Sequence, residues 1–72
     1  MMDYYENYKA LAMAIVEQAA SDYKRHLMGK VQSTTPSKGN LEAFFRSYWF
    51  VVLTEGNIDG ETLLVNMQEV FG

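Results

Sequence analysis

The acidic string between Glu55 and Gly60 has the spacing that comes nearest to a known chemical site. Glu55, Asn57 and Asp59 alternate along it and a glycine follows at the sixth position, as in the first half of a calcium-binding EF-hand loop. The twelfth position, where such a loop needs a glutamate that holds the ion through both oxygens, is Asn66. We therefore expect no metal here, and we interpret Asp59 as the N-cap of a helix.

Catalytic chemistry would need residue types that this chain lacks. His26 is the single histidine among 72 residues, and there is no cysteine. Neither a catalytic triad nor a zinc centre can be assembled in one subunit from these side chains, and no acid and base are paired elsewhere. The sequence therefore predicts no enzyme, no cofactor and no metal site, with His26 as an exposed residue at a helix end.

A small basic group formed by Lys24, Arg25 and Lys30 could contact DNA or RNA, with an aromatic ring as a stacking surface. Basic side chains in the last turn of a helix are, however, also favoured by the helix dipole. The net charge of −3 disfavours general binding to phosphates. A nucleic-acid-associated accessory protein is therefore the second hypothesis, and nucleic acid is a disfavoured partner.

An aromatic-rich segment follows the middle of the chain. Its apolar spacing favours a helix over about 41–54 that begins after Asn40 as N-cap, although residues 48–53 are also rich in strand-favouring types. The helix would place four side chains in the core, namely Phe44, Tyr48, Val52 and Leu53. Three others could reach a partner, because Trp and Arg are typical of binding hot spots: Arg46, Trp49 and Phe50. The alternative for Arg46 is an ion pair with Glu42 or Asp59.

The string from Phe44 to Phe50 reads FFRSYWF; it is followed by Leu-Thr and then by Ile-Asp-Gly-Glu with a leucine two residues on. This pattern resembles FFRSxWFxxLT…DGExL in small proteins of undefined role from phages and prophages of Gram-positive bacteria. The resemblance covers roughly residues 44–64, with a looser match over 16–24. It departs from the family at Tyr48, where an acidic residue is common, and in the hydroxyl-rich linker. It implies a phage origin and a shared fold, and it implies no catalytic residue.

Three helices must position these residues. The first is predicted over about 3–28, with Asp3 as N-cap and Gly29 as the stop, because apolar side chains recur there in steps of three and four. A linker over 29–40 contains the only proline, and a short last helix is predicted over about 60–70. The expected fold is all-α: long helix, loop, aromatic-rich helix, turn and short helix.

The predicted core is too small for the apolar surface that the chain carries. A first helix about 40 Å long cannot be covered by the remaining residues, and neither disulfides nor zinc can brace the fold. A homodimer would complete the core. Its face is expected to include four residues of the first helix: Tyr8, Ala12, Met13 and Ile15.

The leading hypothesis is a non-enzymatic, homodimeric helical protein that binds another, unidentified protein. No apolar run is long enough to span a membrane and the N-terminus is acidic, so we expect a soluble protein in the cytoplasm of a bacterial host cell. Residues 41–72 hold five acidic residues and one arginine. A third hypothesis is therefore an acidic inhibitor that mimics nucleic acid and blocks a host defence enzyme.

Overall fold

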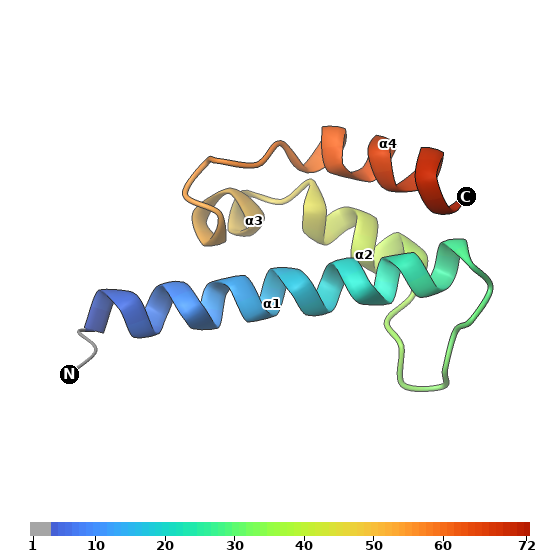
Figure 1. Ribbon diagram of the computed structural model, residues 1–72, viewed down its shortest axis with the longest axis horizontal. Helices are drawn as coiled ribbons and strands as arrows, with labels where there is room; N and C mark the ends of the chain where they lie inside the picture. The colour runs from blue at the N-terminus through green and yellow to red at the C-terminus, as the bar shows by residue number, and fades with distance from the viewer. Residues whose placement is uncertain (1–3) are drawn as a thin grey trace.

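A computed structural model describes the backbone of residues 4–72 and the side chains from residue 7 onward. Within this range the chain forms helices and loops without a strand, which confirms the all-α prediction and makes residues 48–53 helical. The predicted cap at Asp3 lies outside the described residues. The helices are α1 (Tyr4–Leu27), α2 (Lys38–Phe45), α3 (Tyr48–Leu53) and α4 (Gly60–Phe71) (Figure 1).

Helix α1 is the longest helix, and the other three helices pack along one side of it (Figure 1). It ends where the sequence predicts, because Gly29 adopts a φ of 71° that favours glycine. The amide of Lys30 then donates to the carbonyl of Arg25 at 2.8 Å, and the amide of Gly29 donates to that of His26 at 3.2 Å. This pair of hydrogen bonds is the Schellman arrangement, which satisfies the last carbonyls of a helix.

The prediction of a single helix over 41–54 is wrong, because the helix is interrupted at Ser47. The hydroxyl of Ser47 donates to the carbonyl of Phe44 at 2.6 Å and accepts from the amide of Phe50 at 3.2 Å. Its backbone is extended, with φ −83° and ψ 157°, so it acts as the N-cap of α3. A serine that bonds to nearby backbone in this way competes with helix continuation.

The start of the second helix also differs from the prediction. Helix α2 begins at Lys38, and its N-cap is Ser37, whose hydroxyl accepts from the amide of Asn40 at 3.2 Å. Asn40 therefore lies inside the helix and does not cap it. The linker is correspondingly shorter than the predicted 29–40.

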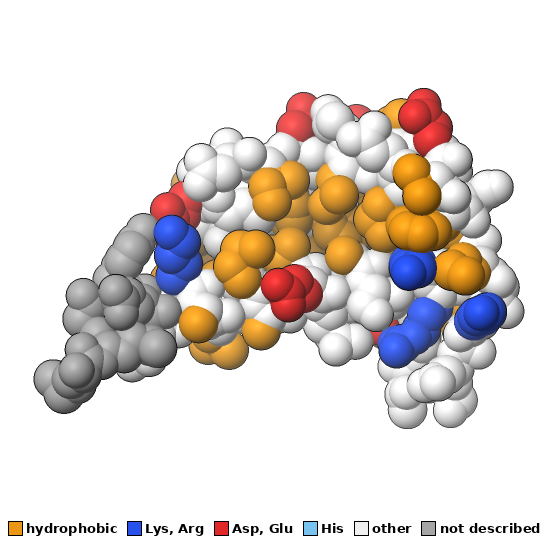
Figure 2. Space-filling view, viewed as in Figure 1, with side chains coloured by type: hydrophobic (Ala, Val, Ile, Leu, Met, Phe, Trp, Pro, Cys, Tyr) orange, Lys and Arg blue, Asp and Glu red, His pale blue; other side chains and the backbone are white. Residues whose placement is uncertain are grey.

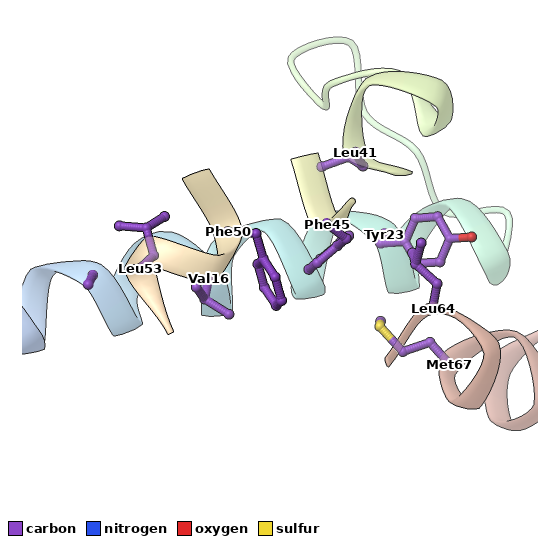
Figure 3. Close-up of a cluster of buried hydrophobic side chains, with 9 residues drawn as sticks. Val16, Tyr23, Leu41, Phe45, Phe50, Leu53, Leu64 and Met67 are labelled. Carbon is purple, nitrogen blue, oxygen red and sulfur yellow. The ribbon is translucent and has the colours of Figure 1, made fainter. Parts of the chain in front are cut away.

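The core lies between α1 and the three helices that cover it, and each of the four contributes to it (Figure 3). Phe45 and Phe50, which flank the break at Ser47, meet edge to face with ring centroids 5.4 Å apart. Phe45 also meets Tyr23 of α1 edge to face, at 6.0 Å. The buried hydrophobic side chains are Ala12, Val16, Tyr23, Leu41, Phe45, Phe50, Leu53, Leu64 and Met67.

The hydroxyl of Tyr23 joins α1, α2 and α4 through two hydrogen bonds. It donates to Glu42 Oε2 of α2 at 2.8 Å and accepts from Gln68 Nε2 of α4 at 2.9 Å. Burial raises the pKa of Tyr23, and the neighbouring carboxylate of Glu42 acts in the same direction. The hydrogen bond from Gln68 opposes this shift.

Helix α4 begins as the sequence predicts and runs one residue further. Asp59 Oδ1 accepts from the amides of Glu61 at 3.0 Å and Thr62 at 3.5 Å, so Asp59 is the N-cap. The next residue, Gly60, packs directly on the end of α2. A Cβ atom there would lie 1.8 Å from the carbonyl oxygen of Phe45. Only glycine permits this contact between the two helices.

Candidate interaction surfaces

The outer side of α3 carries the most exposed aromatic side chains among the described residues. Tyr48 is 80% exposed, Trp49 52% and Val51 45%. Helix α3 has only six residues, and it turns Phe50 and Leu53 inward, so these three must face outward. We call Tyr48, Trp49 and Val51 the α3 face.

Two predictions about the aromatic segment are corrected by this geometry. Phe50, predicted to reach a partner, is 1% exposed, because the break at Ser47 rotates it into the core. Tyr48, predicted to be core, lies on the α3 face. The prediction that Trp49 is accessible agrees with its exposure, and Leu53 is buried as predicted.

Arg46 lies at the turn that leads from α2 into α3, and it is paired with neither residue that the sequence suggested. Its Nε donates to Glu61 Oε2 at 2.7 Å and its Nη2 donates to Glu61 Oε1 at 3.3 Å. The hydrogen bonds and charge of Glu61 raise the pKa of Arg46, while the hydrogen bonds from Arg46 lower the pKa of Glu61. Both side chains remain more than half exposed, so this bidentate pair lies at the protein surface.

A groove of about 500 Å³ opens between α1 and α2, and we call it the α1–α2 groove. Its apolar walls come from both helices. Asp22 lies on the α1 side, where its Oδ1 accepts from Gln18 at 3.1 Å and from Arg25 at 3.0 Å. The lining residues are Ala14, Ile15, Gln18, Ala19, Asp22, Pro36, Asn40, Leu41 and Phe44.

The four predicted dimer residues of α1 do not form one surface. Ile15 lines the α1–α2 groove, and Tyr8 follows the same side of the helix toward its N-terminus. Met13 instead borders a smaller hollow of about 210 Å³ next to Leu53 on the side of α3. Ala12 is 2% exposed and belongs to the core, which corrects its assignment to a dimer face.

The sequence reasoning missed Leu11, which is 62% exposed and lies on the same side of α1 as Ile15, one turn away. Its spacing from Ile15 was the available signal that the two share a surface. The groove itself could not be read from the sequence, because Leu41 and Phe44 come from a helix whose docking position the sequence does not show.

The basic residues at the end of α1 are largely engaged within the chain. Lys24 Nζ lies 4.7 Å from the ring centroid of Phe71, as in a cation–π contact, and Arg25 is ion-paired with Asp22. Lys30 is exposed. His26 Nε2 lies 2.6 Å from the carbonyl oxygen of Pro36, which can only accept, so the ring nitrogen donates and holds the linker against α1. Figure 2 shows apolar side chains gathered in a band between α1 and the helices that cover it.

Among the side chains of residues 7–72, the acidic and histidine groups form no cluster of three or more that could hold a metal ion. Over the described backbone of residues 4–72, every helix is too short or too polar to cross a lipid bilayer. Comparisons with protein-family profiles, with curated proteins and with solved structures found no match to this chain.

Proposed function

We propose that this chain is a non-enzymatic protein-interaction module with one surface for a different protein and another for its own copy. The observation that carries the proposal is the exposure of Tyr48 and Trp49 on α3. The core is filled by other aromatic residues, chiefly Phe45 and Phe50, so the fold does not use these two rings. Large aromatic side chains that a fold leaves outside are the residue types that dominate binding hot spots.

The surroundings of the α3 face support this role. Arg46 lies two residues before Tyr48, and its pair with Glu61 offers charged hydrogen-bonding groups beside an apolar centre. An apolar centre with a polar border is the usual anatomy of a protein interface. The phage origin suggested by residues 44–64 remains a prediction and would make the partner a host or phage protein.

Trp49 provides a direct test, because it is the only tryptophan in the chain. We expect its fluorescence emission to shift to shorter wavelength when a partner covers the α3 face. The partner would be captured from host lysate with the tagged wild-type chain and then titrated in purified form against the chain. A purified partner that binds without changing the emission of Trp49 would contradict the proposal.

Variants then show which residues bind. Tyr48→Ala combined with Trp49→Ala is expected to weaken partner binding at least tenfold while the thermal unfolding midpoint stays nearly unchanged, since both side chains are exposed. Val70→Ala is the matched control, because Val70 is an apolar residue that is 72% exposed on α4. Equal loss of binding in both variants would contradict a specific role for the α3 face.

The two alternative functions are tested with the same protein. The nucleic-acid hypothesis requires a salt-dependent mobility shift with random DNA or RNA that is lost when Lys24, Arg25 and Lys30 are replaced. The acidic-inhibitor hypothesis requires binding that depends on Glu and Asp side chains of residues 41–72. Neither has an observation comparable to the exposed rings of the α3 face.

A further inference from the structure

The α1–α2 groove and the exposed side chain of Leu11 lie on the same side of α1. Leu11, Ile15 and Gln18 follow one another at steps of four and three residues, which places them in one stripe along the helix. Leu11 projects from this stripe with 62% of its surface exposed, whereas Gln18 lies among the residues that line the groove. The surface therefore carries both an apolar projection and an apolar hollow, about 10 Å apart along the axis.

The charges on this stripe do not oppose an identical partner. Leu11, Ala14, Ile15 and Gln18 are uncharged, and Asp22 at the far end is already bonded to Arg25 and Gln18. Two copies can meet along this stripe without placing like charges opposite each other. A strongly charged partner would find no complementary charge there.

The exposed surface of the chain is larger than that of a compact monomer of the same mass. It measures 5001 Å², whereas a compact monomer of this mass exposes about 4,500 Å². The excess is roughly 500 Å², which is smaller than the surface of about 800 Å² that each partner buries in a standard interface.

We propose that two copies pair through antiparallel α1 helices, so that Leu11 of each copy enters the α1–α2 groove of the other. A two-fold axis that crosses α1 between Ala14 and Ile15 places residue 11 of one copy opposite residue 18 of its mate. Leu11 then contacts the groove between Gln18 on α1 and Phe44 on α2 of the other copy. Both contacts form at once, as an isologous interface requires, and the small Ala14 near the axis lets the helices approach closely.

This dimer rests on the proposed function, which gives the chain a surface for its own copy, and it specifies which residues meet and in which orientation. It leaves the α3 face of each copy to a different partner. The two proposals can therefore fail separately, since one is tested by the mass of the purified protein and the other by the response of Trp49.

Analytical ultracentrifugation across 1–100 µM tests the association. We expect the wild-type chain to sediment with twice its mass of 8.2 kDa, and Leu11→Arg to sediment as the monomer. Val70→Arg adds the same charge at an exposed residue of α4 and should remain dimeric. Circular dichroism confirms that each variant stays folded. A wild-type monomer at 100 µM, or a dimer in Leu11→Arg, would overturn the inference without touching the role of the α3 face.

The orientation is tested by charge exchange between two variants. Gln18→Glu should also weaken self-association, because two acidic groups would then face the apolar Leu11 side chains of the opposite copies. A mixture of Leu11→Arg with Gln18→Glu should form a one-to-one dimer, because one contact becomes an ion pair and the other keeps its native residues. Two variants that stay monomeric after mixing would contradict the antiparallel register.

Discussion

Among the glycines, the tightest steric constraint is at Gly60, where α4 starts against the carbonyl oxygen of Phe45. We expect Gly60→Ala to destabilise the fold by about 3 kcal/mol or more, because the added methyl group overlaps backbone that cannot move without separating α2 from α4. Urea denaturation followed by circular dichroism measures this. Gly39→Ala is the control: a Cβ there meets nothing within 4 Å, so helix propensity should stabilise α2 by up to about 1 kcal/mol. Similar effects at both glycines would contradict the assigned contact.

A second prediction at the scale of one residue concerns the phenol of Tyr23. Because its pKa is raised in the folded state, the folded protein holds this proton more tightly than the unfolded chain does. The resulting stabilisation is present below pH 10 and is lost as the pH rises through the folded-state pKa. Tyr23→Phe removes both hydrogen bonds and should lower the free energy of unfolding at pH 7 by about 1 kcal/mol. Between pH 7 and alkaline pH, the stability of this variant should fall less than that of the wild type.

Urea midpoints from pH 7 to pH 11 measure this difference. Tyr48→Phe is the matched control, because it removes an exposed phenol from α3. If Tyr23→Phe and the wild-type chain lose stability in parallel above pH 10, the hydroxyl of Tyr23 is not the group responsible.

At the scale of the elements, the break between α2 and α3 depends on Ser47. Ser47→Ala removes both hydrogen bonds of its hydroxyl and should cost about 1 kcal/mol, as is usual for the loss of an N-cap. Ser33→Ala, in the exposed linker, should change stability by less than about 0.5 kcal/mol. Differential scanning calorimetry of the two variants compares them directly. An equal or smaller effect at Ser47 would show that packing alone maintains the break.

This break also marks how far the sequence could predict the fold. The end of α1 and the start of α4 were predictable, because Gly29 and Asp59 are local signals that act whatever the rest of the chain does. The break between α2 and α3 was not predictable, because apolar residues keep helical spacing through Ser47. Ser47 caps α3 only if the break lets both Phe45 and Phe50 pack in the core, and the sequence does not show this. Phe50 was therefore misplaced, and Tyr48 with it.

The residues of the α3 face and of the α1–α2 groove were predictable only in part. Trp49 and Ile15 were identified from residue type and spacing, and both are at least partly exposed. Ala12 was misassigned, because only docking of the other helices decides which of the two apolar sides of α1 is covered. The α1–α2 groove depends on the same docking.

At the scale of the whole molecule, dimerisation links stability to concentration. If folding and association are coupled, the melting temperature should rise by about 5–10 °C over a hundredfold increase in chain concentration. Thermal unfolding at 1 and 100 µM measures this. Leu11→Arg should melt at one temperature throughout that range. A wild-type midpoint that does not change with concentration would contradict the coupling.

Because the other helices cover only one side of α1, the two sides of this helix should differ in how many substitutions they tolerate. Val16 and Tyr23 lie under the covering helices and should tolerate few replacements, whereas Glu17 and Ser21 are exposed and should accept many. A saturation-mutagenesis profile along α1 would then oscillate with the period of the helix. Selection for the dimer would make Leu11 intolerant of substitution as well, although it lies on a different side of α1 from Val16 and Tyr23. The profile would thereby separate positions conserved for folding from positions conserved for association.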